Sequence, residues 1–353
     1  MKKLAVLFLL TLYVSFSFAC STFLLSKDGH HVFGRNYDWV SGNGMVMVNA
    51  RGLKKTSFSP PGAEKVSWLS RWGSITFNQY GKEFPHGGMN EAGLVVELMW
   101  LTETTYPAAD GRAGVNELQW IQYQLDNCAT VEDVIATDQL LRIDRMGAAP
   151  LHYLVADARG NAATIEFIKG KMVVHRGKDL PYPVLTNTVY SDALRRVENG
   201  KALAVASFTD NSLDRFATAC RMVQQFKEAK NVQKPIDYAF DILDKVAQGP
   251  YTKWRIVYDI TDRKIFFTTS DNTQRRYFAF SDFDFACNRP SLAFHLSDRK
   301  GGAVAPFFAP LDYTTNKTLI QKTAQESRSA IRIPAELINS ASGYFQEVKC
   351  EKR

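Results

Sequence analysis

The chain has 353 residues, of which 45% are hydrophobic and 12% aromatic, as in globular proteins rather than disordered ones. Its formal net charge of +7 comes from 43 basic and 36 acidic residues that are spread along the chain, so nothing indicates nucleic-acid binding. The 6 histidines show no metal-ligand spacing, and we expect neither a metal nor a cofactor.

The first 19 residues have the pattern of a secretory signal peptide. A basic start (Lys2, Lys3) is followed by an apolar run over residues 4–14 and by the small residue Ala19. Cleavage after Ala19 would make Cys20 the first residue of an exported chain whose charge falls from +7 to +5. A terminal cysteine carries a nucleophilic thiol and a basic α-amine on one residue, so we expect Cys20 to be functional.

The local sequence leaves other interpretations of Cys20 open. Cys20 is one of 5 cysteines, so it could be a half-cystine, although an odd number leaves at least one thiol unpaired. It could carry a lipid anchor, but that processing usually requires an aliphatic residue where Ser17 stands. It could follow an uncleaved membrane anchor, but the apolar run is shorter than the ~20 residues of a spanning helix. A conventional Cys–His pair would need a histidine near Cys20 in the fold.

Strands dominate the first hundred residues. Ser21–Ser26 and His31–Asn36 form a predicted hairpin, which would hold Cys20 rigidly at the start of a buried strand. Further strands are predicted over Met45–Ala50, Ser74–Gln79 and Leu94–Leu101, with a surface loop over Gly52–Glu64 and a glycine-rich turn over Gly87–Gly93.

Helices and strands then alternate. Helical spacing over Gly114–Leu141 predicts two helices that meet near Cys128–Thr130, with Thr130 as an N-cap. Later helices are predicted over Ser191–Glu198, Leu213–Lys227 and Ile236–Gln248, and strands over Leu151–Ala156, Ala163–Phe167, Met172–His175, Val184–Asn187, Trp254–Ile260, Lys264–Thr269 and Tyr277–Phe280.

This order predicts an α+β fold of antiparallel sheets with helices outside them. No linker or internal repeat divides the chain, so we expect a single domain over residues 20–353. The part after Pro290 has a less regular pattern than the rest of the chain. It includes a polar helical stretch, Thr315–Ser329, which would be an excursion or an oligomer contact.

Five short motifs, in this order, resemble the choloylglycine hydrolases, a family of N-terminal nucleophile (Ntn) hydrolases that includes penicillin V acylases and conjugated bile salt hydrolases. The motifs are Cys20–Phe23, Gly34–Trp39, Gly88–Leu94, Leu185–Asn187 and Ser212–Phe216. The resemblance implies an αββα sandwich of two antiparallel sheets between helix layers. It also implies hydrolysis of a linear amide without a cofactor, and relatives are often homotetramers.

The resemblance makes Cys20 the nucleophile, with its own α-amine as the base. The thiol pKa of ~8.5 and the amine pKa of ~7.7–8.0 are close enough for proton transfer near neutral pH. Asp38 would orient the amine and Arg35 would favour the thiolate, whereas from spacing alone the two could be a surface ion pair. Asn187, otherwise a turn residue, would donate to the oxyanion. Arg215, otherwise on a solvated helix face, would be a second active-site cation.

The second oxyanion donor of the family is a backbone N–H that corresponds to Trp100 here. The bile salt hydrolases carry Asn at that position, so the chain departs from them while keeping the backbone donor. Trp100 and Trp39 would line the substrate pocket, although either could simply be packed in the core. The two tryptophans resemble the Gram-negative branch of the family, which implies a periplasmic enzyme. The sequence does not choose among penicillin V, acyl-homoserine lactones and conjugated bile salts as substrate.

Overall fold

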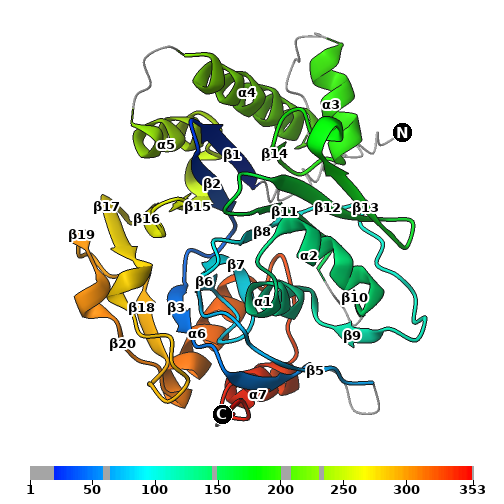
Figure 1. Ribbon diagram of the computed structural model, residues 1–353. Helices are drawn as coiled ribbons and strands as arrows, with labels where there is room; N and C mark the ends of the chain where they lie inside the picture. The colour runs from blue at the N-terminus through cyan, green and yellow to red at the C-terminus, as the bar shows by residue number, and fades with distance from the viewer. Residues whose placement is uncertain (1–19, 59–63, 145–148, 200–207, 230–233, 352–353) are drawn as a thin grey trace, which may run out of the picture.

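The computed structural model describes residues 20–351 apart from 59–63, 145–148, 200–207 and 230–233 (Figure 1). The predicted signal peptide, residues 1–19, lies outside the described residues.

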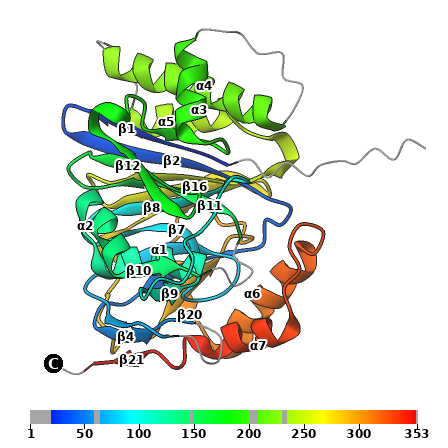
Figure 2. The ribbon, with the colours of Figure 1, turned by 90° about the vertical axis from the view of Figure 1, so that its right-hand side faces the viewer.

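Two large, mainly antiparallel sheets stack face to face between helices, which confirms the predicted α+β class and the αββα order of layers (Figure 2). The first sheet has 7 strands, in the order β14 (Val184–Leu185), β1 (Ser21–Lys27), β2 (His30–Asp38), β15 (Thr252–Asp259), β16 (Lys264–Thr269), β17 (Asn272–Ala279) and β19 (Gly302–Ala303). The predicted N-terminal hairpin is therefore at the centre of the fold.

The second sheet has 9 strands. Their order is β13 (Lys171–Arg176), β12 (Ala162–Ile168), β11 (Leu151–Ala156), β8 (Val95–Trp100), β7 (Pro85–Asn90), β6 (Ser74–Asn78), β3 (Met45–Asn49), β18 (Leu292–His295) and β20 (Ala309–Pro310). Two small sheets pair β9 (Ala113–Val115) with β10 (Leu141–Ile143), and β4 (Leu53–Thr56) with both β5 (Ser67–Leu69) and β21 (Lys349–Cys350).

Helices cover the outer faces of both sheets. The first sheet is covered by α3 (Tyr190–Glu198), α4 (Phe208–Glu228) and α5 (Pro235–Lys245), and the second by α1 (Glu117–Asn127) and α2 (Val131–Ala136). As predicted, α2 begins at Thr130, whose side chain accepts from the Asp133 N–H in a capping box. Short 3₁₀ turns lie at Thr137–Gln139, Gly177–Asp179, Gly249–Tyr251, Phe280–Asp282 and Ala305–Phe307.

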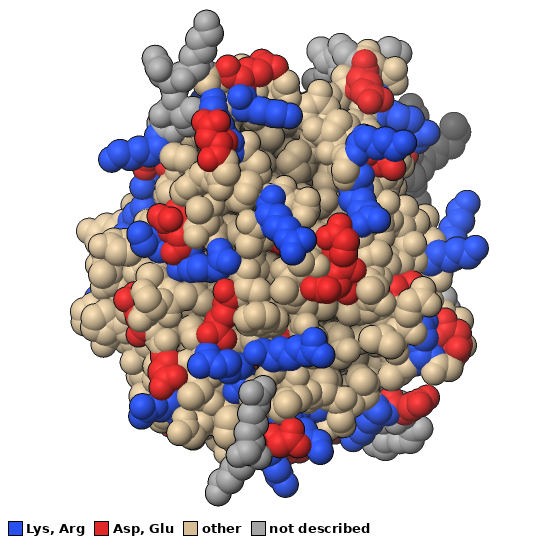
Figure 3. Space-filling view, in the orientation of Figure 1, with Lys and Arg blue, Asp and Glu red and all other residues tan. Residues whose placement is uncertain are grey.

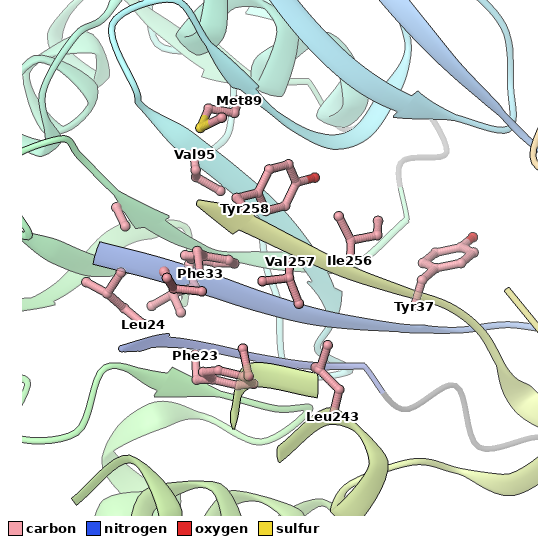
Figure 4. Close-up of a cluster of buried hydrophobic side chains, with 14 of the residues drawn as sticks. Phe23, Leu24, Phe33, Tyr37, Met89, Val95, Leu243, Ile256, Val257 and Tyr258 are labelled. Atoms are coloured by element: carbon pink, nitrogen blue, oxygen red, sulfur yellow. The ribbon is translucent and has the colours of Figure 1, made fainter. Parts of the chain in front are cut away.

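Both faces of the first sheet are buried, as Figure 4 shows for one part of the core. Phe33 and Tyr258 face the second sheet, with ring centroids 6.1 Å apart. Phe23 lies on the opposite face, toward Leu243 of α5 and directly over Gly34. Because the hairpin is covered on both sides, polar side chains at its ends are withdrawn from bulk water.

The part of the chain after Pro290 closes one end of the molecule. The predicted helix over Thr315–Ser329 is present as α6 (Tyr313–Glu326), and a further helix, α7 (Ala335–Tyr344), packs against it (Figure 2). Strand β21 then pairs with β4, and a disulfide joins Cys350 to Cys287. Cys20, Cys128 and Cys220 are buried and free.

Two local predictions are wrong. The predicted surface loop Gly52–Glu64 contains strand β4, which is stabilised by pairing with distant β21 and β5; residues 59–63 lie outside the described part of the chain. The predicted turn Gly87–Gly93 begins as strand β7, and only its last residues turn. Gly87 and Gly88 do not form a turn; they allow neighbouring strands and side chains to lie close to the β7 backbone. A Cβ at Gly87 would lie 2.0 Å from the Glu97 carboxylate.

We predict that Gly87→Ala lowers the free energy of unfolding by about 1–3 kcal/mol, because the added methyl group collides with a buried carboxylate. Urea unfolding followed by far-UV circular dichroism measures the change. Gly343→Ala in α7 is the matched control, since its Cβ would meet only Tyr313 at 3.8 Å and alanine favours a helix. An equal loss of stability in both variants would contradict the prediction.

Candidate active site

Cys20 lies immediately before β1, at one end of a cavity of about 400 Å³. Its side chain is only 4% exposed. Burial raises the pKa of the thiol; the Arg35 charge opposes this rise and the Asp38 charge adds to it. In this environment the thiol needs a nearby base to form a thiolate.

Asp38 ends β2, and its main-chain oxygen lies 4.0 Å from the Cys20 sulfur. One carboxylate oxygen, Oδ1, accepts a hydrogen bond from the Thr252 hydroxyl. The other, Oδ2, is buried without a hydrogen-bond partner among the described residues. Burial raises the pKa of Asp38 to about 7, against the opposing effects of Arg215, Thr252 and Arg35. Because a buried polar oxygen without a donor is costly, an additional hydrogen-bond donor at Oδ2 would stabilise this carboxylate.

Arg35 is fully buried, so the surface ion pair considered from spacing does not exist. Residues three apart on a strand point to opposite faces, and Arg35 faces the second sheet. There its guanidinium donates to the Glu97 carboxylate and, at 2.8 Å, to the His86 main-chain oxygen. Glu97 also accepts from the Tyr258 hydroxyl. Arg35 thus places a positive charge beneath Cys20 while its own partner is Glu97.

Arg215 is 3% exposed on α4 and does not lie on the solvated face of its helix. Its Nη1 donates to the Cys20 main-chain oxygen at 2.6 Å and to the Ser21 hydroxyl at 2.7 Å. Its Nη2 donates to Asn187 Oδ1 at 3.0 Å. Burial lowers the pKa of Arg215 to about 10, so the group stays charged near neutral pH. This one guanidinium joins the start of β1 to Asn187, two residues beyond the end of β14.

Asn187 lies just beyond β14, where the Ser212 hydroxyl accepts from its main-chain N–H at 2.9 Å. Its side-chain Nδ2 donates to the Trp100 main-chain oxygen at 2.8 Å. An amide nitrogen carries two hydrogens, so Asn187 can donate a second hydrogen bond. The structure therefore brings together the two predicted oxyanion positions, Asn187 and the Trp100 backbone.

Both predicted pocket tryptophans line the cavity with Cys20. Their ring centroids are 6.2 Å apart, and the planes are inclined by 34°. The Trp39 indole N–H donates to the Ser327 hydroxyl at 2.9 Å. The two rings pack against each other and form an apolar wall of the cavity that Cys20 also lines.

His86 is the histidine that lines the same cavity among the residues described. Burial, with a further effect of Arg35, lowers its pKa to about 3. No hydrogen bond joins a histidine to Cys20 in the described part of the chain. The same residues hold no group of three or more metal-ligating side chains. A conventional Cys–His pair thus finds no support in this geometry.

All seven predicted site residues converge on one region, but the sequence reasoning missed several of their partners. Glu97 had a visible signal, since it is the one charged residue in the apolar run Leu94–Leu101. Ser212 begins one of the five motifs, but no role was predicted for it. Thr252 and Tyr258 carried no local signal, because each comes from a distant segment that only the fold brings near.

A buried thiol immediately before an interior strand, in a fold of two stacked sheets between helix layers, is the arrangement that the resemblance to the Ntn-hydrolases implies. The family described as linear amide C–N hydrolases, choloylglycine hydrolase family, matches residues 20–206, more than half of the chain. The chain belongs to this family, and it is an enzyme. A non-enzymatic lipoprotein finds no support in the comparison.

Individual relatives agree with this assignment. A penicillin V acylase from Pectobacterium atrosepticum is 26% identical over 315 residues, which is 74% of this chain and 81% of the relative. The structure of penicillin V acylase from Agrobacterium tumefaciens has a TM-score of 0.71 at 24% identity, covering 83% of this chain and 98% of that one. A variant of conjugated bile acid hydrolase from Clostridium perfringens has a TM-score of 0.66 at 18% identity, covering 80% and 98%.

On the face shown in Figure 3, basic and acidic side chains of the described residues are interspersed, and neither sign forms a continuous stripe. Among the same residues, no helix has both the length and the apolarity needed to cross a membrane.

The pKa of Asp38 predicts a pH-dependent stability in a chain that keeps residues before Cys20, where the Cys20 nitrogen is an uncharged peptide nitrogen. The folded pKa of about 7 exceeds the unfolded value of about 3.9, so the folded state binds more protons between these values. The wild-type chain should therefore lose up to about 4 kcal/mol of stability from pH 4 to pH 7 through this group, and Asp38→Asn should not.

Urea unfolding of both chains across this pH range measures the effect. In a chain that begins at Cys20, an α-ammonium near Asp38 should reduce the difference between wild type and Asp38→Asn. If wild type and Asp38→Asn, both with residues before Cys20, show the same dependence of stability on pH, Asp38 does not titrate as stated.

Proposed function

We propose that the protein is exported to the periplasm and that residues 1–19 are removed during export. The product is a cysteine Ntn-hydrolase with Cys20 at its N-terminus. The observation that carries the proposal is the buried Asp38 carboxylate beside Cys20, whose Oδ2 has no hydrogen-bond partner in the described chain. A new α-ammonium on Cys20 would supply the cation that this carboxylate lacks. Burying an unpaired carboxylate is costly, so this position favours a charged amine.

In the proposed reaction, the α-amine of Cys20 takes the thiol proton and the sulfur attacks the amide carbon. The oxygen becomes an oxyanion and the carbon becomes tetrahedral. Collapse breaks the C–N bond as the α-ammonium returns its proton to the leaving amine. The acyl group is left as a thioester, which a water molecule hydrolyses with the α-amine again as base. The products are a carboxylic acid and an amine.

The surrounding residues have separate roles in this scheme. Asn187 and the Trp100 main-chain N–H donate to the oxyanion. Arg35 lowers the pKa of the thiol against the effect of burial. Arg215 fixes the Cys20 carbonyl and Asn187 relative to each other through its two donor nitrogens. The active site is thus made of side chains that are already held before substrate arrives.

The substrate is an N-acyl amide of the penicillin V, acyl-homoserine lactone or conjugated bile salt type. The names of the relatives support the penicillin V and bile salt types, and the acyl-homoserine lactone type rests on the resemblance of the two tryptophans alone. The apolar wall of Trp39 and Trp100 fits an apolar acyl group. We also propose that the enzyme is a homotetramer, as the resemblance to the family implies. Size-exclusion chromatography with light scattering tests it.

The first test replaces the nucleophile. Cys20→Ala should abolish turnover of a panel of N-acyl amides while circular dichroism and the thermal midpoint stay close to wild type. Mass spectrometry of the secreted wild-type protein should give an N-terminus at an unmodified Cys20. Full activity in Cys20→Ala, or an N-terminus that retains residues or an acyl group, would overturn the mechanism.

The second test replaces an oxyanion donor. Asn187→Ala should lower kcat by about 10²–10³ with a smaller change in KM, because the lost hydrogen bond matters most when negative charge develops on oxygen. Asn161→Ala is the matched control, because it removes the same side-chain amide at a turn that does not line the cavity. An unchanged kcat in Asn187→Ala would remove Asn187 from the oxyanion site.

A further inference from the structure

The cavity that Cys20, Trp39 and Trp100 line extends to residues outside the candidate active site. Its lining includes residues from the part of the chain after Pro290. Three polar residues, Asn116, Glu117 and Arg332, line this region with a larger number of apolar ones, among them Phe58, Phe84, Leu118, Ile331, Leu337 and Ile338. Ile331 lies in the connection between α6 and α7, and Leu337 and Ile338 lie at the start of α7. We call this connection and the first turn of α7 the 327–338 segment. This segment lies beyond residue 206, where the match to the family ends.

Hydrogen bonds attach the start of the 327–338 segment to the catalytic end of β2. Ser327 accepts from the indole of Trp39, the residue next to Asp38. The preceding residue, Glu326, accepts from the Ser41 hydroxyl at 2.5 Å, and Thr323, one turn earlier in α6, accepts from the Asn43 amide at 2.8 Å. The loop that follows Asp38 therefore positions the segment relative to the nucleophile.

The far end of the segment is also fixed. The Tyr344 hydroxyl at the end of α7 donates to the main-chain oxygen of Thr56, and Tyr344 packs edge-on against Phe58 at 5.6 Å. The disulfide between Cys350 and Cys287 closes the chain just beyond it. Leu337, between these anchors, is 40% exposed although it lines the cavity. A large apolar side chain in this position is available for contact with an apolar ligand.

We propose that the 327–338 segment is the specificity-determining wall for the acyl group, and that it selects among acyl groups by the length of their apolar chain. The acyl carbon would be at Cys20, the chain would pass Trp39 and Trp100, and its end would contact Ile331, Leu337 and Ile338. This inference rests on the proposed function. It adds a specificity role for residues that make no contact with the reacting bond.

The test uses N-acyl p-nitroanilides whose unbranched acyl groups lengthen by one CH₂ at a time. For the wild-type enzyme, kcat/KM should rise about fourfold for each CH₂ until the chain reaches the 327–338 segment, since each buried CH₂ contributes a similar transfer free energy. Leu337→Trp should shorten the cavity. It should leave the shortest substrate within twofold of wild type and lower kcat/KM for the longest by at least tenfold.

Leu140→Trp is the matched control, because Leu140 is 63% exposed and does not line the cavity. Leu337→Ala is the second variant, which should move the plateau of kcat/KM to longer chains. If the wild-type enzyme is active and Leu337→Trp shows the same dependence on chain length as Leu140→Trp, the wall assignment is wrong. If the wild-type enzyme cleaves no amide of any length, the proposed function fails instead.

Discussion

The buried ion pair between Arg35 and Glu97 joins the two sheets at the point where the active site forms. Arg35 belongs to β2 of the first sheet and Glu97 to β8 of the second, and neither side chain is exposed. Removing one partner of such a pair typically costs about 3–5 kcal/mol, because the other charge stays buried. The space for it exists because position 87 of β7 has no side chain. The Arg35–Glu97 pair therefore both fills the space between the sheets and places a positive charge near Cys20.

The site keeps its charges on the two faces of one sheet. Arg35 and Glu97 lie between the sheets, whereas Asp38 and Arg215 lie toward the helices. Cys20, immediately before the first strand of the β1–β2 hairpin, is affected by charges from both faces of the sheet. This division lets an Arg and an Asp act on one sulfur without forming an ion pair with each other. A direct pair would neutralise the groups that the proposed chemistry needs.

Much of the fold follows from local sequence. The alternation of strands and helices predicted the layers, and Thr130 predicted the start of α2 at its capping residue. The failures share one physical cause, which is pairing between distant segments. Strand β4 is short and polar, and it is a strand because β21 and β5 lie beside it. Such partners cannot be recognised from the residues of β4 themselves.

The candidate site shows the same contrast. Short motifs predicted Cys20, Asp38 and Asn187, because each motif combines a residue type with a fixed place in a strand or turn. The partners that complete the site, such as Thr252 on Asp38 and Ser327 on Trp39, come from far along the chain. A hydroxyl residue in a distant segment has no feature that distinguishes it from any other. Its role becomes visible only through the fold.

The cavity is lined by residues that are far apart in the sequence, from Cys20 to Ala341. A growing polypeptide cannot complete this cavity until residue 341 has emerged from the ribosome. A translation product that stops before the 327–338 segment would therefore have its thiol in place but its cavity open on one side. The order of synthesis delays a closed cavity until long after Cys20 has been made.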